Sequence, residues 1–178
     1  MKGQKMDGSI QVYYGNGRGK TTAALGLGIR AAGVGKQVIM VQFLKKKHSD
    51  TLDFLKKLEP ELQIFRFEKA ACGYSDLSPK EKQEQMLNIK NALGYSRKVL
   101  DTGQCDLLIL DEIFGLVDYN IITIEELMDL IAVKKDSMDL ILTGRNLPDE
   151  VREIADCVYS IQREKEKTPE ILAQGNLS

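Results

Sequence analysis

The sequence is short of the residues from which zinc sites and disulfide frameworks are built. Its 178 residues include one histidine, His48, and three cysteines, at positions 72, 105 and 157, with no CxxC pair. A common structural zinc site needs four Cys or His ligands at close spacing, so this class is excluded. An odd and sparse set of cysteines also favours a reducing compartment over a disulfide-rich secreted protein. Tryptophan is absent altogether.

The chain also lacks a charge excess and long apolar runs. Lys and Arg total 25 against 26 Asp and Glu, a net charge of −1, which provides no long-range attraction for nucleic acid or an anionic membrane. No apolar run approaches the roughly 18 residues that span a bilayer, and residues 1–8 have no signal-peptide core. With 43% hydrophobic residues, we expect a folded cytoplasmic protein. We expect a single domain over 1–178, with a mobile polar tail over 163–178.

Short apolar segments alternate with amphipathic ones along the chain. The pattern predicts strands at 10–14, 38–43, 64–67, 107–110, 140–143 and 158–162, and helices at 20–32, 51–58, 79–101, 123–132 and 148–155. Strands separated by crossover helices predict a three-layer α/β domain with a mainly parallel sheet. We expect Gly26 and Gly28, inside the first helix, to allow close packing on that sheet.

A glycine-rich segment between the first strand and the first helix is the strongest functional signal. Glycines let backbone N–H groups turn toward phosphate oxygens, and the helix N-terminus attracts anions. Lys20 is expected to reach the terminal phosphates and the Thr21 hydroxyl to ligate Mg²⁺. The loop is one residue shorter than a usual P-loop, and the alternative is an ordinary glycine-rich turn. The predicted nucleotide-binding residues are Gly15, Asn16, Gly17, Arg18, Gly19, Lys20, Thr21 and Thr22.

Two further strands end in polar residues. The apolar run 107–110 leads into Asp111 and Glu112, and carboxyl ends of parallel strands face the ligand crevice, so this pair is a candidate Mg²⁺ site. The alternative is a solvated acidic strand end. Arg145 follows the strand 140–143 and could neutralise a polyphosphate, or belong to an exposed turn. The run Lys45–His48 is interpreted as a solvated loop; the alternative is contact with an acidic donor protein or with corrinoid side chains.

These motifs together resemble the P-loop corrinoid adenosyltransferases, which act on cob(I)alamin or cob(I)yrinic acid a,c-diamide. The resemblance rests on residues 15–33, Val41-Gln42-Phe43, Asp111-Glu112-Ile113 and Thr143-Gly144-Arg145-Asn146. It implies a RecA-like P-loop NTPase fold. It also implies transfer of the 5′-deoxyadenosyl group of ATP to Co(I) of a corrinoid with release of tripolyphosphate, in adenosylcobalamin synthesis or salvage.

The resemblance further implies roles for individual residues and partners. ATP and a corrinoid are the substrates, Mg²⁺ is the cofactor, and a flavoprotein electron donor and a homodimer are expected, with no nucleic acid or membrane. Thr21 and Glu112 would hold Mg²⁺, with Asp111 supporting them. Residues 16–22 would bind ATP. Arg30 and Arg145 would also contact ATP, and the implied catalytic residues are Lys20, Glu112 and Tyr74.

The chain departs from the family pattern on the corrinoid side. The family commonly has a Gly-Phe-Thr-Trp-like segment whose aromatic residues help to remove the lower axial ligand of cobalt. Here the matching stretch is Gly73-Tyr74-Ser75-Asp76. Phe114 stands where an Asn is usual, and the C-terminal segment is reduced to 168–178. Two alternatives therefore remain: another P-loop ATPase or phosphotransferase, and a non-catalytic protein that binds ATP or a corrinoid.

Overall fold

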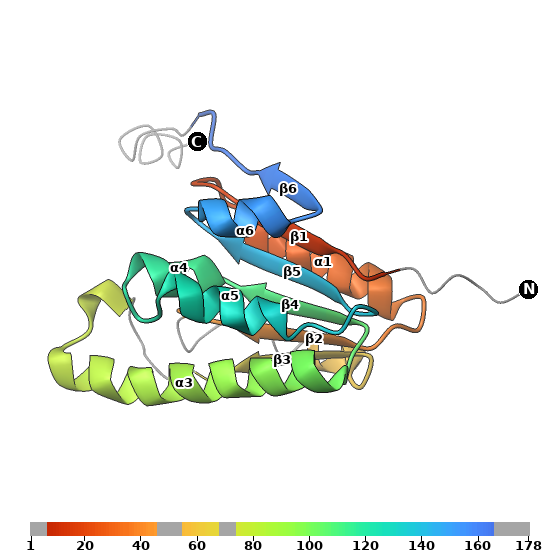
Figure 1. The fold of residues 1–178 in the computed structure, drawn as a ribbon, viewed down its shortest axis with the longest axis horizontal. Helices are drawn as coiled ribbons and strands as arrows, with labels where there is room; N and C mark the ends of the chain where they lie inside the picture. The colour runs from red at the N-terminus through yellow and green to blue at the C-terminus, as the bar shows by residue number, and fades with distance from the viewer. Residues whose placement is uncertain (1–6, 46–54, 68–73, 166–178) are drawn as a thin grey trace, which may run out of the picture.

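A single parallel sheet organises the part of the chain that the computed structural model describes, residues 7–45, 55–67 and 74–165 (Figure 1). Its strands are β1 (Ile10–Tyr14), β2 (Val38–Gln42), β3 (Leu62–Arg66), β4 (Leu107–Asp111), β5 (Asp139–Gly144) and β6 (Cys157–Ser160). They lie in the order β3-β2-β4-β5-β1-β6, and every pairing is parallel. All six carboxyl ends therefore meet at one edge.

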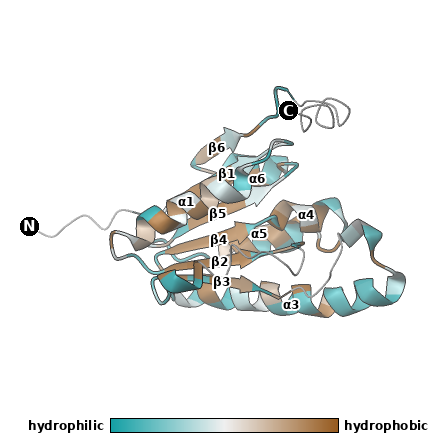
Figure 2. Ribbon diagram, turned by 180° about the vertical axis from the view of Figure 1, so that it is seen from behind, coloured by the Kyte–Doolittle hydropathy of each residue, from teal (hydrophilic) through white to brown (hydrophobic). Residues whose placement is uncertain are grey.

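Helices cover both faces of this sheet. They are α1 (Lys20–Ala32), α3 (Pro79–Thr102), α4 (Ile113–Asp118), α5 (Ile124–Ala132) and α6 (Asp149–Ile154), with 3₁₀ turns η1 (Lys56–Leu58) and η2 (Tyr74–Asp76). Successive strand residues point to opposite faces. In β4, Leu107 and Ile109 pack under α1, whereas Leu108 and Leu110 join the larger core beneath the other helices. Figure 2 shows the hydrophobic colour concentrated in the central strands β2, β4 and β5, as expected for strands buried on both faces of a sheet.

The helix starts differ in how their free N–H groups are satisfied. Ser78 and Thr123 cap α3 and α5, and each forms a capping box with the glutamate three residues later, Glu81 or Glu126. Hydrogen bonds from Ser78 also hold the pKa of the exposed Glu81 carboxyl below its usual value. The 13-residue α1 begins after Gly19 with no side-chain cap and no acidic residue in its first turn. Its first N–H groups are therefore open to water or to an anion.

The sequence prediction of a parallel α/β fold is confirmed, and most predicted boundaries agree within two residues. The helix α4 and the turn η2 were not predicted, because each is shorter than two helical turns and carries no periodic signal. Part of the predicted helix 51–58 lies outside the described residues, as does most of the predicted tail, and the single-domain organisation stays a prediction. A Cβ on Gly28 would lie 3.1 Å from Ile109, so that glycine packs closely, whereas Gly26 has open space and the prediction for it is wrong.

None of the helices in the described ranges is both long and apolar enough to cross a membrane.

Candidate active site

The loop between β1 and α1 adopts a backbone conformation that depends on glycine. Gly15 and Gly19 have φ angles of 121° and 115°, which L side chains rarely adopt. A Cβ on Gly15 would overlap the carbonyl oxygen of Ile161, and the Gly17 N–H donates to the same oxygen at 2.9 Å. The Gly15 N–H donates to the Arg145 carbonyl at 3.0 Å. The loop is thus braced from both sides by the segments that follow β5 and β6.

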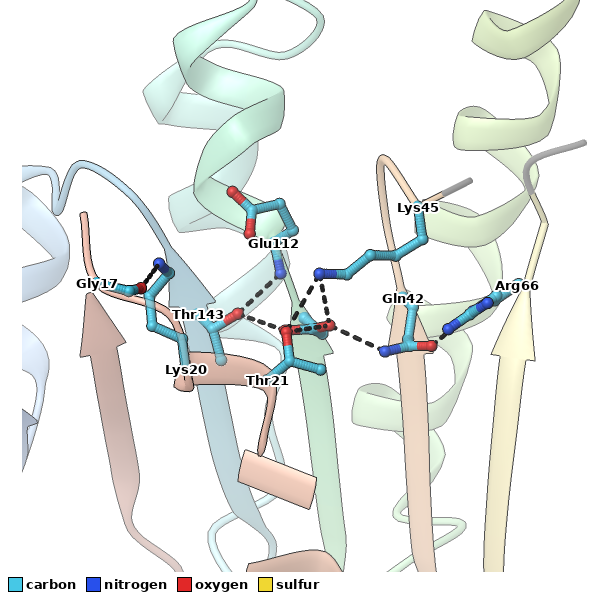
Figure 3. A network of polar contacts seen from close by, with 9 residues as sticks. Gly17, Lys20, Thr21, Gln42, Lys45, Arg66, Glu112 and Thr143 are labelled. Atoms are coloured by element: carbon cyan, nitrogen blue, oxygen red, sulfur yellow. Dashed lines mark hydrogen bonds and ion pairs between the residues drawn. The ribbon is translucent and has the colours of Figure 1, made fainter. Parts of the chain in front are cut away.

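Lys20 folds back over this loop. Its Nζ atom donates to the carbonyl oxygen of Gly15 at 2.7 Å and to that of Gly17 at 3.0 Å. Figure 3 shows the contact with Gly17. A lysine ammonium has three donors, and carbonyls are weaker partners than the oxygens of a phosphate. The ammonium can therefore exchange its hydrogen bonds to these carbonyl oxygens for stronger ones to a bound anion.

Asp111 is the centre of a buried polar cluster at the carboxyl end of β4. Its side chain is fully buried, and it accepts hydrogen bonds from three uncharged donors. These are the Thr143 hydroxyl at 2.7 Å, the Thr21 hydroxyl at 2.9 Å and the Gln42 amide at 3.0 Å. The Lys45 ammonium lies 3.4 Å from the carboxylate. We call these five residues (Thr21, Gln42, Lys45, Asp111 and Thr143) the Asp111 cluster.

The sheet order explains how this cluster assembles. Strand β5 lies between β1, which leads into the P-loop, and β4, which ends at Asp111. Thr143 at the end of β5 therefore lies between the P-loop and Asp111, and it donates to the Asp111 carboxylate. On the other side, Gln42 of β2 is the register partner of Asp111. The cluster therefore joins the ends of three strands to the first turn of α1.

Arg66 fixes the orientation of the Gln42 amide. The Arg66 Nε–H donates to Gln42 Oε1 at 2.6 Å, and because a guanidinium can only donate, the amide nitrogen must face Asp111. Burial lowers the pKa of the Arg66 guanidinium from its ordinary value, and the charge of Asp111 opposes that shift. The relay from Arg66 through Gln42 thus extends the Asp111 cluster to β3, the outer neighbour of β2 (Figure 3).

Glu112 occupies a strained position directly after Asp111. Its φ angle is 62°, in the left-handed region that non-glycine residues seldom adopt, and such strain is concentrated at functional sites. Its backbone N–H donates to the Thr143 hydroxyl at 2.9 Å, and that hydroxyl donates in turn to Asp111. No described residue gives its carboxylate a hydrogen bond or ion pair, so both oxygens are available.

Of the remaining predicted nucleotide-binding residues, four lie around the P-loop and one lies at the other edge of the sheet. Arg145 is exposed beside the loop that its carbonyl braces. Asn16 Oδ1 accepts the Arg163 N–H at 3.2 Å, and Arg18 and Thr22 are exposed around the loop. Arg30 lies in the last turn of α1, where it lines a hollow with Lys36 and Asp139 at the amino-terminal edge of the sheet. The structure does not bring Arg30 to the P-loop.

Tyr74 lies near the far end of α4. Its half-buried ring contacts the ring of Tyr119, with centroids 5.3 Å apart, and the Lys82 ammonium lies 5.8 Å from its centroid. Since α4 begins directly after Glu112, this helix links Tyr74 to the acidic strand end. Gly73 lies outside the described residues. Phe114 is fully buried, and a Cβ on Gly144 would overlap its side chain, so Phe114 packs α4 against β5.

Sequence reasoning missed three members of the Asp111 cluster. Gln42 and Thr143 contributed only to the family resemblance and were given no role in the site, although each is a lone polar residue at the end of an apolar strand. The interpretation of Lys45 as a solvated loop residue is wrong, because its side chain is 29% exposed and its ammonium contacts Thr21 and Asp111. Lys46, Lys47 and His48 lie outside the described residues.

The donor set at the strand end suits a hard cation. Thr21, Asp111 and Glu112 offer only oxygen atoms, which Mg²⁺ prefers. No group of three or more His, Cys, Asp or Glu side chains with metal-site geometry occurs among the described residues. Mg²⁺ typically takes one or two carboxylates and completes its octahedron with water and substrate phosphates, so the small protein set fits this ion.

Comparisons with known proteins show the family to which the chain is related. Residues 6–175 match the model of the family described as ATP:corrinoid adenosyltransferase BtuR/CobO/CobP. The corrinoid adenosyltransferase of Escherichia coli K12 is 30% identical over 155 residues, which cover 87% of this chain and 76% of the relative. The corrinoid adenosyltransferase CobA of Salmonella typhimurium LT2 is 30% identical over 159 residues, which cover 89% and 79%.

Solved structures resemble the chain in fold. A KaiC-like protein from Pyrococcus horikoshii superposes with a TM-score of 0.58 at 20% identity, covering 91% of this chain and 75% of the neighbour. An ATP synthase subunit from Nanoarchaeum equitans superposes with a TM-score of 0.56 at 16% identity, covering 95% and 48%. At these identities the likeness concerns the P-loop fold alone.

Proposed function

The chain belongs to the ATP:corrinoid adenosyltransferase family, and we propose that its P-loop and Asp111 cluster hold the ATP whose 5′-deoxyadenosyl group passes to the cobalt of a corrinoid. The observation that carries this assignment is the hydrogen bond from the Thr21 hydroxyl to Asp111 at 2.9 Å. It joins the start of α1 to the acidic strand end across β5. A nucleotide bound at the loop would therefore have its phosphates beside the two carboxylates.

The triphosphate is held by residues 16–22. The uncapped N–H groups at the start of α1 face the anion, and Lys20 moves from the two carbonyls that it contacts to the phosphate oxygens. Because Gly15 and Gly17 donate their N–H groups to Arg145 and Ile161, the phosphate-binding amides come from the later part of the loop. Arg145 lies close enough in the fold to add positive charge beside the loop.

Mg²⁺ is held by Thr21 and Glu112, and Asp111 positions Thr21 from behind. Asp111 already accepts several hydrogen bonds, whereas Glu112 has free oxygens, so Glu112 is the better direct ligand. When bound, the ion neutralises charge on the triphosphate as it leaves. The strained backbone of Glu112 keeps its carboxylate at the strand end.

The reaction requires little chemistry from side chains. The Co(I) centre of the corrinoid is itself the nucleophile: a Co–C bond forms at C5′, the C5′–O bond breaks, and its electron pair leaves with tripolyphosphate. Cobalt is formally oxidised from Co(I) to Co(III), and a flavoprotein electron donor supplies the reduced state. Catalysis is then positioning of C5′ together with stabilisation of the leaving group. Such a site needs no Ser, Cys or His nucleophile, so a sequence with a single histidine is compatible with this reaction.

The corrinoid is bound on the side of Tyr74. The Tyr74 and Tyr119 rings offer an aromatic surface near α4, and the family likeness assigns such rings to removal of the lower axial ligand of cobalt. We place the protein in the cytoplasm as a homodimer, on the sparse cysteines and on the family resemblance.

The test is to identify both products after incubation with Mg-ATP and a chemically reduced Co(I) corrinoid. We expect an adenosylated corrinoid and tripolyphosphate in equal amounts, whereas ADP with phosphate would overturn the proposal. Lys20→Ala is expected to lower kcat/KM about a hundredfold or more. Lys90→Ala, an exposed lysine on α3, is the matched control and should keep full activity. Equal activity of the two variants would contradict a role for Lys20 in binding the triphosphate.

A further inference from the structure

The Lys45 ammonium contacts Thr21, a proposed metal ligand, and Asp111, the carboxylate that positions Thr21. Its Nζ atom lies 3.1 Å from Thr21 Oγ1 and 3.4 Å from Asp111 Oδ2 (Figure 3). Lys45 lies just beyond β2, and the Phe43 N–H donates to the Asp111 carbonyl at 2.9 Å, which ties this segment to the end of β4. The position of Lys45 is therefore set by the sheet.

The hydrogen-bond geometry of Thr21 defines which face of its hydroxyl Lys45 covers. A threonine hydroxyl has one hydrogen and two lone pairs. The hydrogen points to Asp111, whose two carboxylate oxygens lie 2.9 and 3.1 Å from Thr21 Oγ1, so the contact with Lys45 uses a lone pair. A metal ion ligated by Thr21 must also use a lone pair. An ammonium 3.1 Å from this oxygen therefore occupies one of its two lone pairs and opposes a second cation at the other by charge repulsion.

The charge of Asp111 explains why an ammonium lies at this position. The carboxylate is fully buried, and a buried charge without a counter-charge is strongly unfavourable. Among the described residues, Lys45 is the cation that forms an ion pair with it, while Arg66 reaches it only through Gln42. The protein thus balances the charge of Asp111 with a side chain of its own.

We propose that Lys45 is a built-in counter-cation that stays against the Thr21 hydroxyl and the Asp111 carboxylate until ATP and Mg²⁺ bind together. This rests on the proposed placement of Mg²⁺ at Thr21 and Glu112. An incoming triphosphate offers the ammonium new anionic partners, so Lys45 leaves the hydroxyl as the metal ion binds. Metal alone brings no such partner and must displace a paired charge. Lys45 therefore makes metal binding depend on nucleotide.

The test measures binding of Mn²⁺, a spectroscopic substitute for Mg²⁺, by electron paramagnetic resonance with and without ATP and in the absence of corrinoid. Lys45→Met keeps the apolar stem and removes the charge. Without ATP, we expect this variant to bind Mn²⁺ about tenfold more tightly than wild type, because a positive charge next to the site is gone. With ATP, the wild-type protein should gain far more affinity for Mn²⁺ than the variant.

Two controls isolate the position of the charge. Lys36→Met removes a positive charge from an ion pair with Asp139 at the opposite edge of the sheet. Lys45→Arg keeps the positive charge at position 45. Without ATP, both variants should bind Mn²⁺ as weakly as wild type. Thermal unfolding provides a second readout: Mn²⁺ alone should raise the Tm of Lys45→Met and leave that of wild type unchanged.

The outcomes separate this inference from the proposed metal site. If Lys45→Met and wild type bind Mn²⁺ equally without ATP, while both bind it with ATP, the role of Lys45 is overturned and the metal site stands. If no form binds Mn²⁺ even with ATP, the metal site is overturned, and the role of Lys45 with it.

Discussion

Thr143 provides a direct measure of what the buried polar network contributes to stability. Its fully buried hydroxyl donates to the Asp111 carboxylate at 2.7 Å and accepts the Glu112 N–H at 2.9 Å. Thr143→Val keeps the volume and removes both bonds. A hydrogen bond to a charged group contributes about 1.5–3 kcal/mol, and an orphaned N–H adds about 1 kcal/mol or more. We therefore expect the free energy of unfolding to fall by about 2–4 kcal/mol.

The measurement is urea unfolding followed by far-ultraviolet circular dichroism, since the sequence has no tryptophan for fluorescence. Thr143→Ser keeps the hydroxyl and loses one methyl group, so its cost should be about 1 kcal/mol. The Val variant should therefore unfold at clearly lower urea than the Ser variant, with unchanged m-values. A Val variant within about 0.5 kcal/mol of wild type would refute the view that Thr143 supports Asp111.

Two other predictions concern the corrinoid side and the cysteines. Tyr74→Ala should impair turnover of a Co(II) corrinoid supplied with a reductant, while ATP binding, measured by calorimetry, is kept. Tyr74→Phe should retain turnover. Unchanged Co(II) turnover in the Ala variant would contradict a role for the ring. Burial raises the pKa of the Cys105 thiol to about 12, so iodoacetamide at pH 8 should alkylate the exposed Cys157 and spare Cys105 until the protein unfolds, as peptide mass spectrometry would show. Rapid alkylation of Cys105 in the native protein would contradict the raised pKa. The unfolded thiol ionises near pH 9.0, so above that pH the unfolded chain binds fewer protons than the native one, and the free energy of unfolding should fall as pH rises toward 12.

The sequence alone was sufficient for the fold class and for the P-loop. Both depend on local signals: apolar runs of strand length, amphipathic helices between them, and the glycines at 15, 17 and 19 before Lys20. The helix starts predicted at 79 and 123 agree with the structure within one residue, and both are local features, because each is capped within four residues by Ser78 or Thr123. Signals of this kind survive without knowledge of the sheet order.

The tertiary structure alone decided which polar residues meet. Thr21 and Asp111 are 90 positions apart in the sequence, and Gln42 and Thr143 join them only because β2 and β5 flank β4. Strand order cannot be read from a list of strands, so Lys45 looked like one charge in a basic run. Parallel pairing brought its ammonium to Thr21 and Asp111, and it left Arg30 at the opposite edge of the sheet. The sequence determined that a nucleotide loop and an acidic strand end exist; the order of the strands determined which cation lies between them.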